Sequence, residues 1–64
     1  MKLEIWVRPD NDLGHAANGF LGDKPMPTRG SSEGVIAAAQ SLAKYLLDRC
    51  IVKASTPVDL LDRP

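Results

Sequence analysis

Few residues of this chain have side chains that could carry chemistry, and two of them occur only once. His15 is the single histidine and Cys50 is the single cysteine. A histidine can act as a general base, but no other residue completes a catalytic set with it. We therefore interpret His15 as a polar residue at the start of a strand. Cys50 follows a predicted helix on its apolar side, so we expect a small buried residue and not a reactive thiol.

The acidic residues and glycines near the N-terminus are better explained by turns than by ligand binding. Asp10 and Asp12 resemble the start of a calcium loop, but Gly14 comes one place early and the twelfth position is Leu21 instead of glutamate. The glycines within 14–22 match neither dinucleotide-binding nor Walker spacing. One cysteine excludes an internal disulfide, and a structural zinc site needs more ligands. The sequence predicts no metal and no cofactor.

The elements that position these residues begin with a strand. Hydrophobic and polar residues alternate over residues 2–8, which is typical of a strand with one buried face. The buried face carries Leu3, Ile5 and Val7; the other carries Lys2, Glu4, Trp6 and Arg8. We expect Pro9 to end this strand and residues 9–14 to form a tight reversal.

Residues 15–30 have a weaker pattern. A second strand is predicted over 15–21, although Asn18-Gly19 could instead form a hairpin turn. Residues 22–25 are predicted to form a loop. A short third strand over 26–29 would be confined to an edge by its two prolines.

The second half of the chain begins with a helical period. Apolar residues recur with period 3.6 over residues 31–49, which predicts an amphipathic helix of about 32–49. Ser31 or Ser32 is expected to cap it, with Glu33 in its first turn. Residues 50–54 are predicted to form another strand, and residues 56–62 a final helical turn.

Composition limits the size of the fold and the class of partner. The 64 residues allow one small domain, 1–64, in which 44% of residues are hydrophobic but seven are alanines. Eight basic residues balance eight acidic ones, so a nucleic-acid binder, which needs a basic stripe, is disfavoured. No apolar run could span a membrane. The lone thiol and the charged N-terminus favour a reducing cytoplasm.

Two segments together resemble the antitoxins of the HicB type. The first is 7–14, Val-Arg-Pro-Asp-Asn-Asp-Leu-Gly, and the second is 30–33, Gly-Ser-Ser-Glu, followed by the alanine- and leucine-rich helix ending at Asp48. The resemblance covers about residues 2–48. This chain departs from the family at His15, where an aromatic residue is usual, and at Gly34, and we expect no DNA-binding domain after the helix.

The resemblance implies a non-enzymatic protein that binds and masks a partner, which in the family is a small ribonuclease toxin. The family core resembles a truncated ribonuclease H fold. This chain has no cluster of carboxylates placed to hold two metals, so we infer no nuclease activity.

We predict an α+β fold, a small antiparallel sheet of three or four strands with one amphipathic helix packed on one face. The predicted core residues are Leu3, Ile5, Val7, Val35, Ala39, Leu42, Leu46, Ile51 and Val52.

The predicted function is a small inhibitor or adaptor that masks a partner protein, either antitoxin-like or a mobile-element or phage accessory protein, and not an enzyme. The alternatives are a self-associating structural module and, less favoured, a nucleic-acid-binding regulator. The partner would be another protein, such as a toxin or a host enzyme.

The predicted protein interface is centred on Trp6, because tryptophan is enriched at interfaces and this one lies on the polar face of its strand. Glu4 and Arg8 flank it with opposite charges. In a two-fold interface Glu4 of one chain would face Arg8 of the other. Because neither a disulfide nor a metal supports so small a core, we expect a homodimer.

Overall fold

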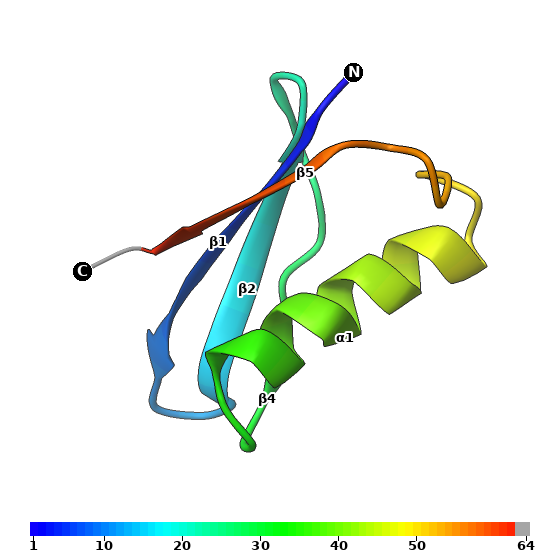
Figure 1. The fold of residues 1–64 in the computed structure, drawn as a ribbon. Helices are drawn as coiled ribbons and strands as arrows, with labels where there is room; N and C mark the ends of the chain where they lie inside the picture. The colour runs from blue at the N-terminus through cyan, green and yellow to red at the C-terminus, as the bar shows by residue number, and fades with distance from the viewer. Residues whose placement is uncertain (63–64) are drawn as a thin grey trace.

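The structure, a computed structural model, describes residues 1–62 (Figure 1). One helix lies on one face of a five-stranded mixed sheet, which confirms the predicted α+β class. The elements, in chain order, are β1 (Leu3–Asp10), β2 (Gly14–Leu21), β3 (Lys24–Pro25), β4 (Arg29–Ser31), α1 (Val35–Asp48) and β5 (Val58–Asp62).

The sheet is built on an antiparallel pair, β1 and β2, aligned from Leu3 opposite Leu21 to Asp10 opposite Gly14. The far side of β2 pairs with β3 at one end and with β4 at the other. On its other side β1 pairs with β5, and this pair is parallel. The prediction of a wholly antiparallel sheet is therefore wrong in this one pairing. A crossover through α1 returns the chain to the start of β1, which gives parallel strands.

The alternation in β1 is confirmed, since Leu3, Ile5 and Val7 are each at most 2% exposed. The strand nevertheless continues past Pro9 to Asp10. The pairing with β5 stops at Val7, so Pro9 lies at an edge position, where the missing N–H group of proline is tolerated.

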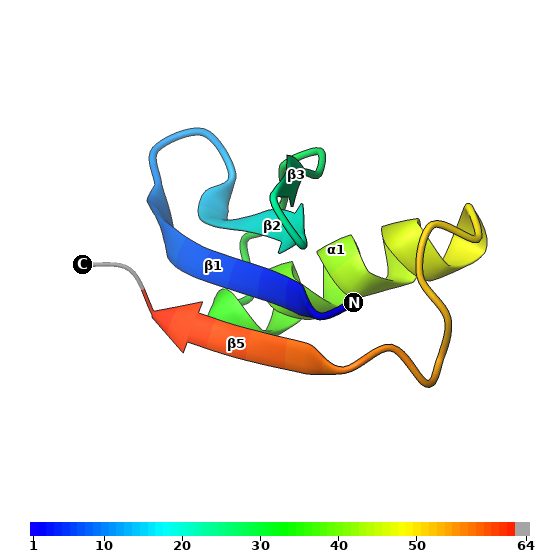
Figure 2. The same cartoon turned by 90° about the horizontal axis from the view of Figure 1, so that it is seen from above.

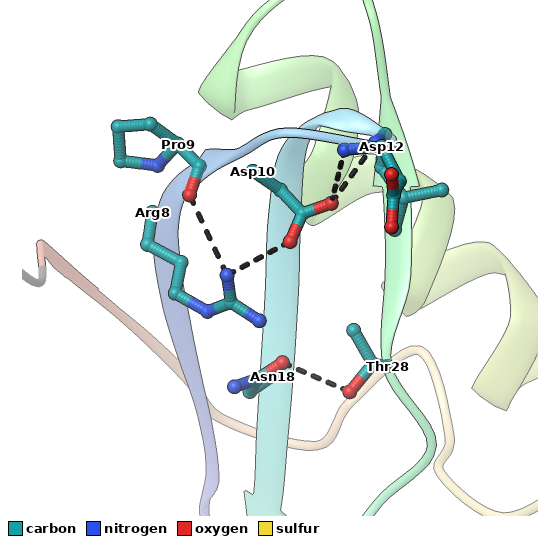
Figure 3. Close-up of polar contacts among 7 residues, drawn as sticks. Arg8, Pro9, Asp10, Asp12, Asn18 and Thr28 are labelled. Carbon is teal, nitrogen blue, oxygen red and sulfur yellow. Dashed lines mark hydrogen bonds and ion pairs between the residues drawn. The ribbon is translucent and has the colours of Figure 1, made fainter.

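The predicted reversal after β1 is confirmed, and the side chain of Asp10 organises it (Figure 3). Its Oδ2 accepts hydrogen bonds from the backbone N–H groups of Asp12 at 3.1 Å and Leu13 at 2.9 Å. Its Oδ1 accepts one from Nη1 of Arg8 at 3.0 Å. The Leu13 N–H group and then the Arg8 guanidinium lower the pKa of Asp10. Because these contacts favour the ionised form, the turn is strongest when Asp10 is charged.

Asp10→Asn should therefore remove a pH-dependent part of the stability. A lowered folded pKa contributes stability above the unfolded pKa, near the ordinary 3.8, and that stability is lost as pH falls through the folded pKa. We expect the variant to melt at lower temperature than the wild type at neutral pH, and the gap to close below about pH 3.8. Circular dichroism melts across this range measure the gap. Asp23→Asn, in the 22–23 turn, is the control, and a pH-independent gap for Asp10→Asn would contradict the prediction.

The chain between β1 and α1 differs from the sequence prediction in its details. β2 runs unbroken through Asn18 and Gly19, so the hairpin alternative is wrong. Gly19 instead allows close approach of the helix, because a Cβ at this position would lie 3.0 Å from Cδ2 of Leu42. The turn falls at residues 22–23, β3 occupies the end of the predicted loop, and the strand predicted at 26–29 is displaced to β4.

The helix starts later than its apolar period predicts. Gly34 is its N-cap residue, with φ of 138°, and makes no side-chain cap hydrogen bond. The Ser31 hydroxyl accepts from the N–H group of Glu33 at 3.1 Å, so it closes a turn before the helix. The predicted capping by Ser31 or Ser32 and the placement of Glu33 in the first turn are wrong. β4 takes up residues 29–31, and only glycine readily adopts the backbone conformation that then begins the helix.

The core lies between α1 and the covered face of β1 and β2. Seven of the nine predicted core residues are buried; Val35 packs against the core while partly buried, and Ile51 is 40% exposed. Ala16, Ala17 and Ala38 are also buried but were not in the predicted core. Four of the ten buried hydrophobic residues are alanines, so the large side chains of the core are few. The buried hydrophobic residues are Leu3, Ile5, Val7, Ala16, Ala17, Ala38, Ala39, Leu42, Leu46 and Val52.

The segment after the helix forms turns, so the strand predicted at 50–54 is wrong. The N–H groups of Cys50 and Ile51 donate to the carbonyls of Leu47 and Leu46, both at 3.0 Å. This is the Schellman arrangement, in which the residue after the cap takes a left-handed conformation. Cys50 takes it, with φ of 57°, and is exposed, so the prediction of a buried core cysteine is also wrong.

Cys50→Gly should stabilise the fold, because glycine has no Cβ to strain in the left-handed region. Glycine also has greater conformational freedom in the unfolded chain, which offsets part of this effect. We therefore expect the free energy of unfolding to rise by about 0.5–1 kcal/mol. Urea denaturation measures it. Cys50→Ala, which removes the thiol but keeps the Cβ, should leave the stability near that of the wild type. Equal gains in both variants would assign the effect to the thiol and not to the backbone.

The last predicted helical turn, 56–62, is instead strand β5. The Thr56 hydroxyl accepts from the N–H group of Lys53 at 3.0 Å and thereby closes the turn that leads into the strand. In the parallel pair, Val58 then lies beside Leu3 of β1 and Leu60 lies beside Ile5. The open edge of β1 offers a row of backbone partners, and this tertiary pairing outweighs the local helix-start signal.

Candidate protein-interaction surfaces

The outer face is the sheet surface opposite α1, and we define it by Glu4, Trp6 and Arg8 of β1 with their cross-strand neighbours. α1 packs on β1, β2 and β4 from one side, and within residues 1–62 no second helix lies on the opposite side (Figure 1). The register places Glu4 between Phe20 and Asp59. The structure therefore brings the three predicted interface residues onto one surface, as the alternation in β1 indicates.

Trp6 lies at the middle of the outer face. It is half-buried, with Asn18 of β2 on one side and Leu61 of β5 on the other. Asn18 is held by Thr28, whose hydroxyl donates to its Oδ1 at 2.9 Å (Figure 3). A large aromatic ring on a rigid strand with fixed polar neighbours is the kind of anchor that dominates binding energy at protein interfaces.

The charges around Trp6 form ion pairs within the chain. Nζ of Lys2 lies 3.1 Å from Oδ2 of Asp59 and 3.9 Å from Oε2 of Glu4. The hydrogen bond with Asp59 raises the pKa of Lys2. Arg8 is engaged by Asp10 at 3.0 Å. A direct pairing of Glu4 with Arg8 of a second copy would compete with these contacts, although exposed ion pairs contribute little stability.

A second surface, which the sequence prediction missed, lies along β5, the strand at the edge of the sheet next to β1 (Figure 2). The helix packs mainly on the other strands, β1, β2 and β4. Ile36 of α1 is 56% exposed, and Val58 and Leu60 of β5 are 53% and 48% exposed. We call these three residues the β5–α1 surface. Ile36 and Leu60 line a groove of about 220 Å³, together with Val7, Val35 and Leu61.

The β5–α1 surface adjoins an open strand edge. β5 pairs with β1 on one side and with no other strand of the described residues, so its second row of backbone groups is available to another chain. Alternation of Val58, Asp59 and Leu60 was the signal that could have revealed this strand. The proline and acid at its start favoured a helical interpretation instead.

The other residues that the sequence brings to notice do not form a catalytic or metal site in the described part of the chain. The described side chains, those of residues 1–61, include no group of three or more His, Cys, Asp or Glu placed to hold a metal ion. His15 lies in β2 opposite Pro9, as predicted for a strand residue, and its buried Nδ1 has no hydrogen-bond partner among these residues. Within the same range, no helix is long and apolar enough to cross a membrane.

Comparison of the chain with protein-family models, with curated proteins and with solved structures finds no match.

Proposed function

We propose that this protein binds another protein in the cytoplasm and acts by masking part of that partner's surface, without catalysis. The observation that carries the proposal is the open outer face with Trp6 at its middle. α1 covers only one side of the sheet. A rigid sheet face with a half-buried aromatic anchor and a rim of both charge signs has the composition of a protein interface.

Occlusion is the mechanism that follows from this geometry. Backbone pairing holds Trp6 between two neighbouring strands, so little conformational freedom is lost when a partner packs over it. An antitoxin that covers a toxin is one protein of this kind, and a mobile-element or phage accessory protein that covers a host enzyme is another. The succession of a strand, an acidic turn, further strands and then a helix supports the antitoxin-like alternative.

Site-specific photocrosslinking in the native host tests the proposal. A crosslinking amino acid replaces Phe20, which lies on the outer face opposite Glu4. The control replaces Gln40, which is exposed on α1. We expect Phe20 to yield one discrete crosslinked protein, identifiable by mass spectrometry, and Gln40 not to yield it. Crosslinks of equal yield from both positions, or none from Phe20, would contradict binding through the outer face.

A second candidate, self-association, is favoured by the β5–α1 surface. We propose that its occupant is a second copy of the chain, with the two β5 edges antiparallel about a two-fold axis. Leu60 of each copy would then lie near the axis, and Val58 and Ile36 would be covered. The core has few large side chains, so burial of these exposed apolar groups supplies support that the single chain lacks. This dimer leaves the outer face open for a partner.

A further inference from the structure

A hollow between β4 and α1 gathers unpaired positive charge around the single tyrosine. Its volume is about 390 Å³. The guanidinium carbons of Arg29 and Arg49 lie 4.0 Å and 3.8 Å from the ring centroid of Tyr45. The lining residues are Leu13, Thr28, Arg29, Gly30, Ser41, Lys44, Tyr45, Asp48 and Arg49.

The charges in this hollow are not balanced within the chain. Arg29, Lys44 and Arg49 form no ion pair with any side chain that the structure describes, which are those of residues 1–61. The hollow has one acidic lining residue, Asp48, and this carboxylate is likewise unpaired within those residues. Three cations and one anion leave an excess of two positive charges on a protein whose net charge is zero.

Stacking on Tyr45 orients the two arginines before any ligand arrives. A guanidinium over an aromatic ring keeps its N–H donors at the edge of the plane, where they remain available for hydrogen bonds. The guanidinium fork matches a carboxylate in geometry, and prior orientation reduces the entropy lost on binding. Leu13 adds an apolar contact at the rim of the same hollow.

We propose that this hollow binds an acidic segment of a protein, in which two neighbouring carboxylates meet Arg29, Lys44 and Arg49 and an apolar side chain meets Leu13. The excess of two charges matches two carboxylates. A nucleic-acid strand is disfavoured because its phosphates would extend beyond the hollow over a protein whose net charge is zero, and Asp48 already lines the site. The hollow has none of Glu4, Trp6 and Arg8 in its lining, so its charges are distinct from those of the outer face, and the two share only Thr28 at the rim, which holds Asn18.

Fluorescence anisotropy with a rhodamine-labelled peptide containing Glu-Glu-Leu between neutral residues tests the proposal. We expect saturable binding, and about ten-fold weaker binding of the peptide with both glutamates replaced by glutamine. Arg29→Gln and Arg49→Gln should each weaken binding about ten-fold, as loss of one charge-assisted contact predicts. Tyr45→Phe, which keeps the ring, should bind as the wild type does.

The control must change the net charge by the same amount. Lys24→Gln with Lys53→Gln removes two exposed cations outside the hollow, to match Arg29→Gln with Arg49→Gln. Equal losses in the two double variants would reduce the effect to bulk charge and overturn the site. Absence of saturation up to about 1 mM peptide would also overturn the site.

Competition with DNA tests the other class of ligand. A single-stranded DNA octamer that displaces the labelled peptide at a lower concentration than the unlabelled peptide does would assign the hollow to nucleic acid. None of these results alters the crosslinking at Phe20, so the two proposals fail separately.

Discussion

Leu60→Asp should convert the proposed homodimer into a monomer. Leu60 is 48% exposed in the single chain and lies at the centre of β5. In the two-fold arrangement the substitution would place two carboxylates, one from each copy, beside each other in a desolvated interface. Burial of an uncompensated charge costs about 3–5 kcal/mol, which corresponds to a dissociation constant raised more than about 100-fold.

The monomer should remain folded, because Leu60 is at the sheet edge and is not among the fully buried residues. Circular dichroism checks the fold, and sedimentation velocity at tens to hundreds of micromolar measures the association. Leu47→Asp is the matched control, since Leu47 is 42% exposed on α1 and does not line the groove beside β5. A wild-type chain that sediments as a monomer would reject the dimer, and a Leu60→Asp dimer would reject this interface.

The first strand, its reversal and the helix could be predicted because their signals are local. The alternation of Leu3, Ile5 and Val7 follows from a strand with one buried face, and the apolar stripe of the helix requires only its own period. The Asp10 turn is equally local, since its side chain bonds to the next residues of the chain.

The C-terminal part of the chain could not be predicted because distant residues decide it. Thr56, Pro57 and Asp59 form a helix-start pattern, and nothing in their vicinity reveals that the edge of β1 is open to them. Cys50 shows the same limit at the helix end. A left-handed residue there is usually glycine, so the sequence gives no sign of the turn that exposes the thiol.

The candidate sites likewise differ in whether local or distant residues form them. Trp6, Glu4 and Arg8 share a face because strand periodicity places them there. The β5–α1 surface and the hollow around Tyr45 each join segments far apart in the chain, Ile36 with Leu60 and Arg29 with Arg49. Such surfaces depend on topology, which neither composition nor periodicity determines.

Trp6→Ala should weaken binding of the partner captured through the outer face. Truncation of an aromatic anchor at the centre of an interface typically costs about 2 kcal/mol or more, equivalent to about 30-fold in affinity. Trp6→Phe keeps part of the ring contact and should lose less. Isothermal titration calorimetry with the purified partner measures the change, and Gln40→Ala on the helix is the control. The comparison requires a temperature at which melts show that every variant is folded.

The same Trp6→Ala variant decides where the two copies of the chain meet. If β5 forms the dimer, the variant loses the partner but sediments as the wild-type dimer does, because Trp6 lies on the opposite side of the sheet from Val58 and Leu60. If Trp6→Ala instead dissociates the dimer and Leu60→Asp does not, the copies meet through the outer face. Glu4 and Arg8 must then exchange their contacts with Lys2 and Asp10 for contacts with the second chain. In that case raised salt concentration should weaken the dimer, whereas an apolar β5–α1 interface should respond little to salt.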